Sequence, residues 1–203
     1  MTLRVSQLDG KATLTLPHGT SDRAAEDFLS DNAVWLVRAR SRLPEIVAVG
    51  AGVLLPVEGR MMSVQIGTGK TAKIESDQII APVKNTGAAV KVALRFAANV
   101  RFDEHVAACA NAIGRNVNQL TMRDPRSRWG SCSTSGSLMF SWRLIMAPPN
   151  VLDYVAAHEV AHLQEMNHSC AFWAVVAELF PDYKAARQWL RKNGNQLHRY
   201  RFD

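Results

Sequence analysis

Hydrophobic and polar positions near the N-terminus alternate, as they do in short β-strands. Leu3 and Val5 are separated by one polar residue, and so are Leu14 and Leu16. A period of two places such side chains on one face of a strand, and the intervening Asp9-Gly10 pair favours a tight turn. The chain is therefore predicted to open with a β-hairpin.

The period then becomes helical and later returns to short strands. Apolar residues three and four apart over residues 24–37 predict a helix that Ser21 or Asp22 caps and that Pro44 ends. Residues 47–82 contain short runs rich in Val and Ile that are separated by glycines, and these runs predict further strands. This part of the chain is thus expected to be β-rich with one helix.

Helical and strand patterns are mixed in the rest of the chain. Helical spacing runs from about Thr86 to near Gly114, a residue type that commonly ends helices, with a break near Phe102 as an alternative. Two strands and then three helices are predicted at residues 117–122, 137–146, 149–166, 169–179 and 183–193. The pattern predicts an α+β fold, with a β-rich N-terminal part at residues 1–85 and a second part at residues 86–203.

The composition is that of a soluble globular protein, because 47% of the 203 residues are hydrophobic and 21% are charged. The apolar runs are much shorter than the roughly 20 residues that span a bilayer, and the N-terminus has no apolar signal segment. Cys109, Cys132 and Cys170 are widely spaced without a CxxC pair, so free thiols in a reducing compartment are expected. These features predict a cytoplasmic protein with no membrane partner.

The net charge of +6 favours anionic partners in general. Basic residues gather from Arg123 to Arg128 and from Arg187 to Arg201, and elsewhere they are scattered. Scattered basic residues are usual on a solvated surface. Nucleic acid therefore stays open as a partner without being indicated.

The strongest chemical signal is the HExxH motif formed by residues 158–162, which lies within a predicted helix. Residues four apart differ by about 40° around a helix, so His158 and His162 can reach one metal ion. Glu159 is offset by about 100° from His158 and can reach a water on that ion without ligating the metal. The spacing predicts a zinc site formed by the two histidines, with Glu159 as the general base.

A catalytic zinc usually has three protein ligands and one open position, so a third ligand is expected. Glu165 shares the helix face, but it lies about 10.5 Å along the axis from His158. His168 follows Asn167 at an expected chain reversal, and Ser169 is placed to cap the next helix. His168 is therefore predicted as the third ligand, and Glu165 as a supporting or surface residue.

A second cluster of unusual residues, RWGSC at residues 128–132, precedes the metal motif. Its Gly130 suggests a close approach of the backbone, and Arg128 could supply positive charge to a substrate carbonyl or phosphate. Arg128 is therefore predicted as a second catalytic residue. In the alternative, Trp129 belongs to the core and Arg128 forms a structural ion pair. Tyr154, on the metal face of its helix, is either a hydrogen-bond donor to an oxyanion or an ordinary buried tyrosine.

A family resemblance is carried by the block from Arg123 to Gly194, which contains SRWGSC, AAHEVAHLQEMNHSC and PDYKAARQWLRKNG. This block resembles the YgjP-like family of metal-dependent hydrolases, which is related to SprT-like zincins. The resemblance implies a zincin-like catalytic half with an HExxH helix, preceded by a small β-rich N-terminal half. It also implies the same three histidines as zinc ligands and the same glutamate as base.

The sequence leaves three functions open. The first is a zinc-dependent metallopeptidase, in which Glu159 activates a water on the zinc for attack on a carbonyl. Because the same groups can attack a phosphorus, a nucleoside triphosphate phosphohydrolase is the alternative, favoured by the basic balance around Arg123 to Arg128. A nucleic-acid-associated metal-binding module is the second alternative, although the chain has no zinc-finger tail or basic arm. The expected substrate is a peptide or a small anionic molecule, and no oligomeric state is predicted.

Overall fold

The computed structural model describes residues 1–6, 10–41 and 43–203, which divide by their contacts into two units, Met1–Ile46 and Val47–Asp203. The sequence pattern instead predicted that a β-rich part ends at residue 85 and that a second part begins at residue 86. The strands before that residue pack against the helix that follows it, so by contacts they belong to the larger unit. As a boundary between functional domains, the division at residue 85 stays a prediction.

The smaller unit begins with the predicted hairpin. Strand β1 (Thr2–Val5) pairs antiparallel with β2 (Ala12–Thr15), and Leu3 lies opposite Leu14. The hairpin is therefore confirmed. Asp9 of the predicted turn lies outside the described residues.

Two helices follow where one was predicted, α1 (Asp22–Asp31) and α2 (Ala33–Ser41). Ser21 caps α1, since its hydroxyl accepts a hydrogen bond from a first-turn backbone N–H at 3.3 Å. The break lies at Asn32, whose side-chain amide donates to the carbonyl of Phe28 at 2.8 Å. The Phe28 carbonyl also accepts the backbone N–H of Asn32 at 3.2 Å, so the side chain adds a second donor to this carbonyl at the end of α1.

Short strands fill residues 47–82 of the larger unit, as predicted. A two-stranded pair joins β3 (Val47–Ala48) in parallel to β11 (Tyr200–Arg201) at the C-terminus. A four-stranded sheet has the order β4-β5-β7-β6, with β5 and β7 parallel and the other pairs antiparallel. Its strands are β4 (Leu54–Val57), β5 (Arg60–Gly67), β6 (Lys73–Ile74) and β7 (Gln78–Pro82).

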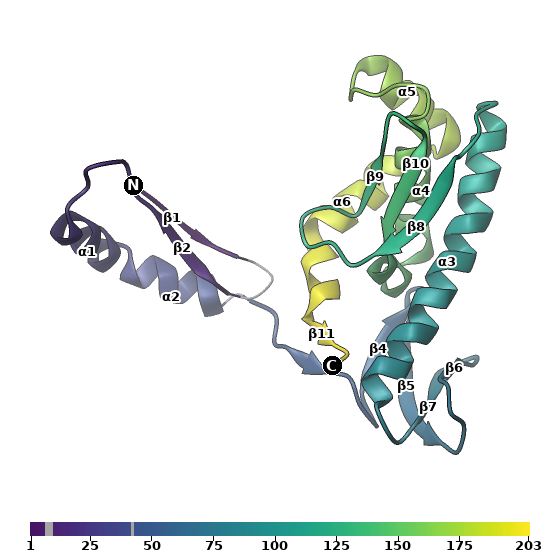
Figure 1. Cartoon of the computed structure of the whole chain (residues 1–203), viewed down its shortest axis with the longest axis horizontal. Helices are drawn as coiled ribbons and strands as arrows, with labels where there is room; N and C mark the ends of the chain where they lie inside the picture. The colour runs from purple at the N-terminus through teal and green to yellow at the C-terminus, as the bar shows by residue number, and fades with distance from the viewer. Residues whose placement is uncertain (7–9, 42) are drawn as a thin grey trace. The chain divides into compact units, whose positions relative to one another are not determined.

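The long helix α3 (Thr86–Ala112) is continuous and runs along the core of this unit (Figure 1). Every fourth residue of one stripe is buried: Val90, Leu94, Ala98, Phe102, Val106 and Ala110. The alternative of a break near Phe102 is wrong, because this residue lies inside the continuous helix. The buried Phe102 ring stacks on Phe140 with centroids 4.2 Å apart. Val92 and Phe96, two apolar residues within the predicted helical stretch, lie on the exposed face of α3.

A three-stranded sheet carries the RWGSC segment. Its order is β8-β10-β9, with β10 parallel to β8 and antiparallel to β9 (Gly130–Cys132), which is an edge strand. The other two strands are β8 (Gln119–Arg123) and β10 (Ser137–Ser141). The predicted strand over residues 137–146 is wrong in its second half, where Trp142–Met146 forms the 3-10 helix η1. All five residues of η1 are buried, the charged Arg143 included, so burial in this run has no period that separates strand from helix.

Three helices end the larger unit: α4 (Pro149–Ala161), α5 (Cys170–Leu179) and α6 (Tyr183–Asn193), with the 3-10 helix η2 (Gly194–Arg199) after them. Helix α4 packs against α3, α5, α6 and β9. It was predicted to continue to Met166 and ends at Ala161 instead. The N–H groups of Leu163 and Gln164 donate to carbonyls three residues back, at 2.9 and 3.1 Å, and this tightens the last turn.

The fold is therefore α+β with the HExxH motif at the end of a buried helix, which confirms the predicted zincin-like class. Cys109, Cys132 and Cys170 are free thiols, as expected. Within the described residues, no helix combines the length and the apolarity that crossing a membrane requires.

Candidate metal centre

Three histidines converge where α4 ends. His158 lies in the last turn of α4, and His162 directly follows the last helical residue with near-helical backbone angles, φ −67° and ψ −15°. The spacing of four residues therefore still places both rings on one face. His168 arrives from the loop between α4 and α5, and one nitrogen of each ring lies within 4.8 Å of the other two.

The ring nitrogens fit a metal ion. The Nε2 atoms of His158 and His168 are 3.2 Å apart. Two nitrogens bound to a tetrahedral zinc at its usual bond length would be about 3.3 Å apart. His162 donates from Nδ1 to the carbonyl of Glu165 at 3.0 Å, which leaves its Nε2 with a free lone pair. The three predicted ligands thus form a group that could hold one ion.

The loop after α4 positions His168 by local hydrogen bonds. The Ser169 backbone N–H donates to the side-chain carbonyl of Asn167 at 3.2 Å, and the Ser169 hydroxyl accepts from the N–H of Phe172 at 3.3 Å. Ser169 is therefore the N-cap of α5, as predicted. Glu165 acts on the centre through its backbone carbonyl.

Aromatic rings cover the histidines. Phe172 is fully buried, and its ring lies 4.9 Å from that of His158, 4.5 Å from that of His162 and 4.8 Å from that of His168. The Trp173 ring lies 5.7 Å from His158 and 5.9 Å from His168. These contacts hold the imidazoles in place and exclude water from one side of the centre.

Burial favours the neutral form of His158 and His162. It lowers the pKa of His158 to about 3, assisted by the charges of His162, His168 and Arg187. Burial also lowers the pKa of His162. A neutral imidazole has the free lone pair that a metal requires. These two histidines can thus bind an ion without first losing a proton.

Glu159 lies next to the histidines on the inner side of α4 and is only 6% exposed. Burial raises the pKa of its carboxyl to about 7, and the Arg128 charge opposes that rise. The backbone of β9 presses against this carboxyl, because a Cβ added at Gly130 would lie 2.6 Å from Glu159 Cγ and Oε1. The close approach suggested by Gly130 therefore exists, and Glu159 is the group approached.

The structure separates the roles of Arg128 and Trp129. A Cβ added at Gly194 would lie 2.9 Å from the Trp129 ring, and the ring centroid of His198 lies 5.2 Å from that of Trp129. Trp129 is therefore a half-buried residue that packs against the C-terminal segment and the edge of the core. Arg128 is exposed, and among the described residues it forms no ion pair. The Arg128 charge lies close enough to Glu159 to lower the pKa of that carboxyl against the effect of burial.

Tyr154 and Arg187 complete the surroundings of the centre. Tyr154 is 5% exposed, its ring lies 5.8 Å from that of His158, and burial raises its pKa to about 12, so its hydroxyl stays protonated. The Arg187 guanidinium lies 4.6 Å above the Trp173 ring. The sequence pattern included Arg187 only in a basic C-terminal stretch. The packing of α6 on α4 brings it to the site, and no local spacing signals that contact.

Comparisons with known proteins found a family model and solved structures that are similar to this chain. A family model described as YgjP-like, metallopeptidase domain, matches residues 1–193. Among solved structures, the crystal structure of the metallopeptidase zymogen of Pyrococcus abyssi abylysin is similar over 45% of this chain and 93% of that chain, with 19% identity and a TM-score of 0.41. No curated protein matches the chain.

Proposed function

The chain belongs to the YgjP-like metallopeptidase family, and from this premise we propose that it is a zinc-dependent peptidase with Glu159 as its general base. The proposal rests mainly on the convergence of three histidine side chains beside the buried carboxyl of Glu159. This carboxyl lies on α4, the helix that also carries His158. A closed structural site would need a fourth side-chain ligand. Among the described residues, the cluster contains three candidate ligands.

His158, His162 and His168 would hold the ion in this proposal. When bound, zinc would supply a Lewis acid for a substrate carbonyl and would acidify a water. Glu159 accepts the proton of the attacking water and passes it to the leaving amine. The Gly130 backbone restricts the rotamers of the carboxyl, so the base is held in one place.

Arg128 is proposed to stabilise negative charge that develops on the substrate. Its position near Glu159 and its exposure leave the guanidinium available to a bound molecule. A planar guanidinium can donate two parallel hydrogen bonds to an oxyanion or a carboxylate. Tyr154 is a second candidate donor, because its hydroxyl keeps its proton.

The edge strand β9 supports a peptide as the substrate. One edge of β9 pairs with β10, and the sheet order leaves the other edge as the border of the sheet. A free edge offers backbone N–H and C=O groups to an extended peptide, and β9 packs on the helix that carries Glu159. A nucleotide has no strand to add there. The phosphohydrolase alternative is therefore the weaker proposal.

An activity screen tests the proposed function. The chain with one equivalent of zinc is expected to cleave casein or fluorogenic peptides and to lose this activity when a chelator removes the metal. Nucleoside triphosphates are expected to stay intact under the same conditions. Phosphate release without peptide cleavage would favour the phosphohydrolase alternative, and cleavage that survives complete removal of metal would contradict the zinc mechanism.

Replacement of Arg128 separates its proposed catalytic role from a structural one. Arg128→Lys is expected to lower turnover by about tenfold and Arg128→Ala by about 100-fold, because a preorganised donor to developing charge is weakened and then lost. The melting temperature and zinc content should stay unchanged. Arg123→Ala, at the exposed end of β8, removes the same charge as a control. A lower melting temperature with normal turnover per zinc in Arg128→Ala would refute the catalytic role.

A further inference from the structure

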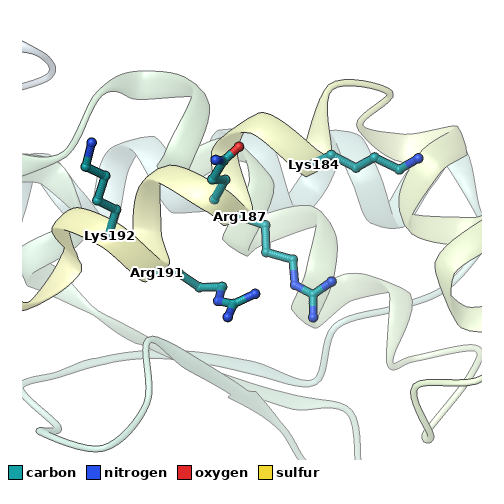
Figure 2. A pocket seen from close by; sticks show the side chains of 5 residues that line it. Lys184, Arg187, Arg191 and Lys192 are labelled. Carbon is teal, nitrogen blue, oxygen red and sulfur yellow. The ribbon is translucent and has the colours of Figure 1, made fainter.

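Helix α6 presents a cationic face near the candidate metal centre. Lys184, Arg187, Arg191 and Lys192, together with Gln188, line a depression of about 550 Å³ (Figure 2). Figure 2 shows the Arg187 and Arg191 side chains extending to the same side of α6. Residues three, four and seven apart share one face of a helix, so one element supplies the whole lining.

The four charges are not neutralised within the described part of the chain. All four side chains are exposed, and none of the described carboxylates forms an ion pair with them. Arg187 and Arg191 lie one turn apart, and like charges at that spacing weaken a helix. The chain thus keeps a self-repelling group that a bound anion would relieve.

This cationic depression begins beside the candidate metal centre. Arg187 lies 4.6 Å above the Trp173 ring. That ring lies 5.9 Å from His168 and 5.7 Å from His158. A substrate bound near the histidines would therefore lie over α6 if its chain continued past the Trp173 side of the centre.

We propose that the cationic face of α6 binds acidic side chains of the peptide substrate, so that the enzyme prefers chains rich in Asp or Glu next to the cleaved bond. The inference rests on the proposed peptidase function. From Lys184 to Lys192 the helix axis advances by about 12 Å. An extended peptide covers that distance with about four residues, so a short acidic segment matches the face.

An acidic peptide fits this face better than a polynucleotide does. Strands of nucleic acid bind to a cationic groove in which free aromatic rings stack on the bases. Among the described residues, the rings of Trp173 and Tyr183 lie beside this depression and stack on each other at 5.4 Å and 21°. The Arg187 guanidinium lies 4.6 Å above the Trp173 ring, and the Lys184 ammonium lies 6.0 Å from the Tyr183 ring. These two rings are therefore already in contact with each other and with the cations of the face, which leaves charge as its main means of binding.

Binding of labelled peptides tests the proposal without requiring turnover. The protein in this assay is the full chain that carries the Glu159→Gln substitution and is loaded with zinc. Fluorescence anisotropy would compare its affinity for a labelled peptide containing four consecutive Glu residues with its affinity for the same peptide containing Gln at those positions. The acidic peptide is expected to bind about tenfold more tightly, and the preference should fall as salt is raised. The double variant Arg191→Gln, Lys192→Gln should lose the preference. The double variant Lys70→Gln, Lys73→Gln, at exposed positions of the β5–β6 region, changes the net charge equally and should keep it.

The outcomes separate this inference from the proposed function. Acidic-selective binding that the α6 variant abolishes, in a chain that cleaves no peptide, would support the cationic face and refute the peptidase. Cleavage of Glu and Gln peptides with equal kcat/KM, together with equal binding, would overturn the inference and leave the peptidase standing. Tighter binding of a single-stranded oligonucleotide that the α6 variant weakens would overturn the inference in favour of nucleic acid. Melting curves establish that both double variants are folded, and Lys184→Gln provides a second test of the same face.

Discussion

Glu159→Gln is expected to bind zinc like the native chain and to lose peptide turnover by about 10²- to 10⁴-fold, the range found for a missing general base. The amide has nearly the shape of the carboxyl, so the packing against Gly130 is kept. It cannot accept the proton of a water. Elemental analysis gives the zinc content and a peptide hydrolysis assay gives the turnover, both measured on the same preparation. The zinc content should stay unchanged while the turnover falls.

A matched control exists on the neighbouring helix. Glu178→Gln makes the same chemical change at an exposed position of α5 and is expected to leave turnover unchanged. Native turnover in the Glu159→Gln variant would show that another group takes the proton. Loss of zinc in that variant would show that the carboxyl helps to hold the ion.

His168→Ala is expected to weaken zinc binding by more than about 100-fold, since even the loss of a residue that only supports a ligand costs up to that factor. Two imidazoles would remain, and both belong to the end of α4. His168 is exposed and lies in a loop, so its removal should leave the fold intact. Competition with a chelating dye measures the affinity, and thermal unfolding without metal measures the fold.

The control for this variant is His18→Ala, which removes an exposed histidine from the smaller unit. It should bind zinc as tightly as the native chain. If His168→Ala also binds zinc with native affinity, the three-histidine site is wrong. Glu165 and Cys170, the other ligand types on either side of His168 in the sequence, would then be the next residues to replace.

The candidate centre could largely be predicted from the sequence because its parts are close together along the chain. His158, His162 and Glu159 are positioned by the repeat of a single helix, which is a local property. His168 could be placed because Ser169 signalled the start of a new helix and therefore a turn before it. Each of these inferences needed only about one turn of chain on either side.

Contacts between segments far apart in the sequence could not be predicted from local spacing. Arg187 reaches the centre only because α6 packs on α4, and Gly130 meets Glu159 only because β9 lies beside the same helix. Apolar character alone also does not establish burial. Val92 and Phe96 strengthened the helical pattern of α3, yet 67% and 72% of their surfaces are exposed. An apolar run shows that a face can be buried, and only the fold shows whether it is.

Because Gly130 has no side chain, it leaves room for Glu159, and the HExxH pattern alone does not describe this requirement. The five letters at the end of one helix describe two of the three candidate ligands and the base, but the space that the base occupies is left open by a residue of another element. A chain with the five letters and a bulky residue at the position of Gly130 would have to move either the strand or the carboxyl. A search pattern for working centres of this design therefore needs a sixth letter, a glycine that lies 28 positions before the first histidine in this chain.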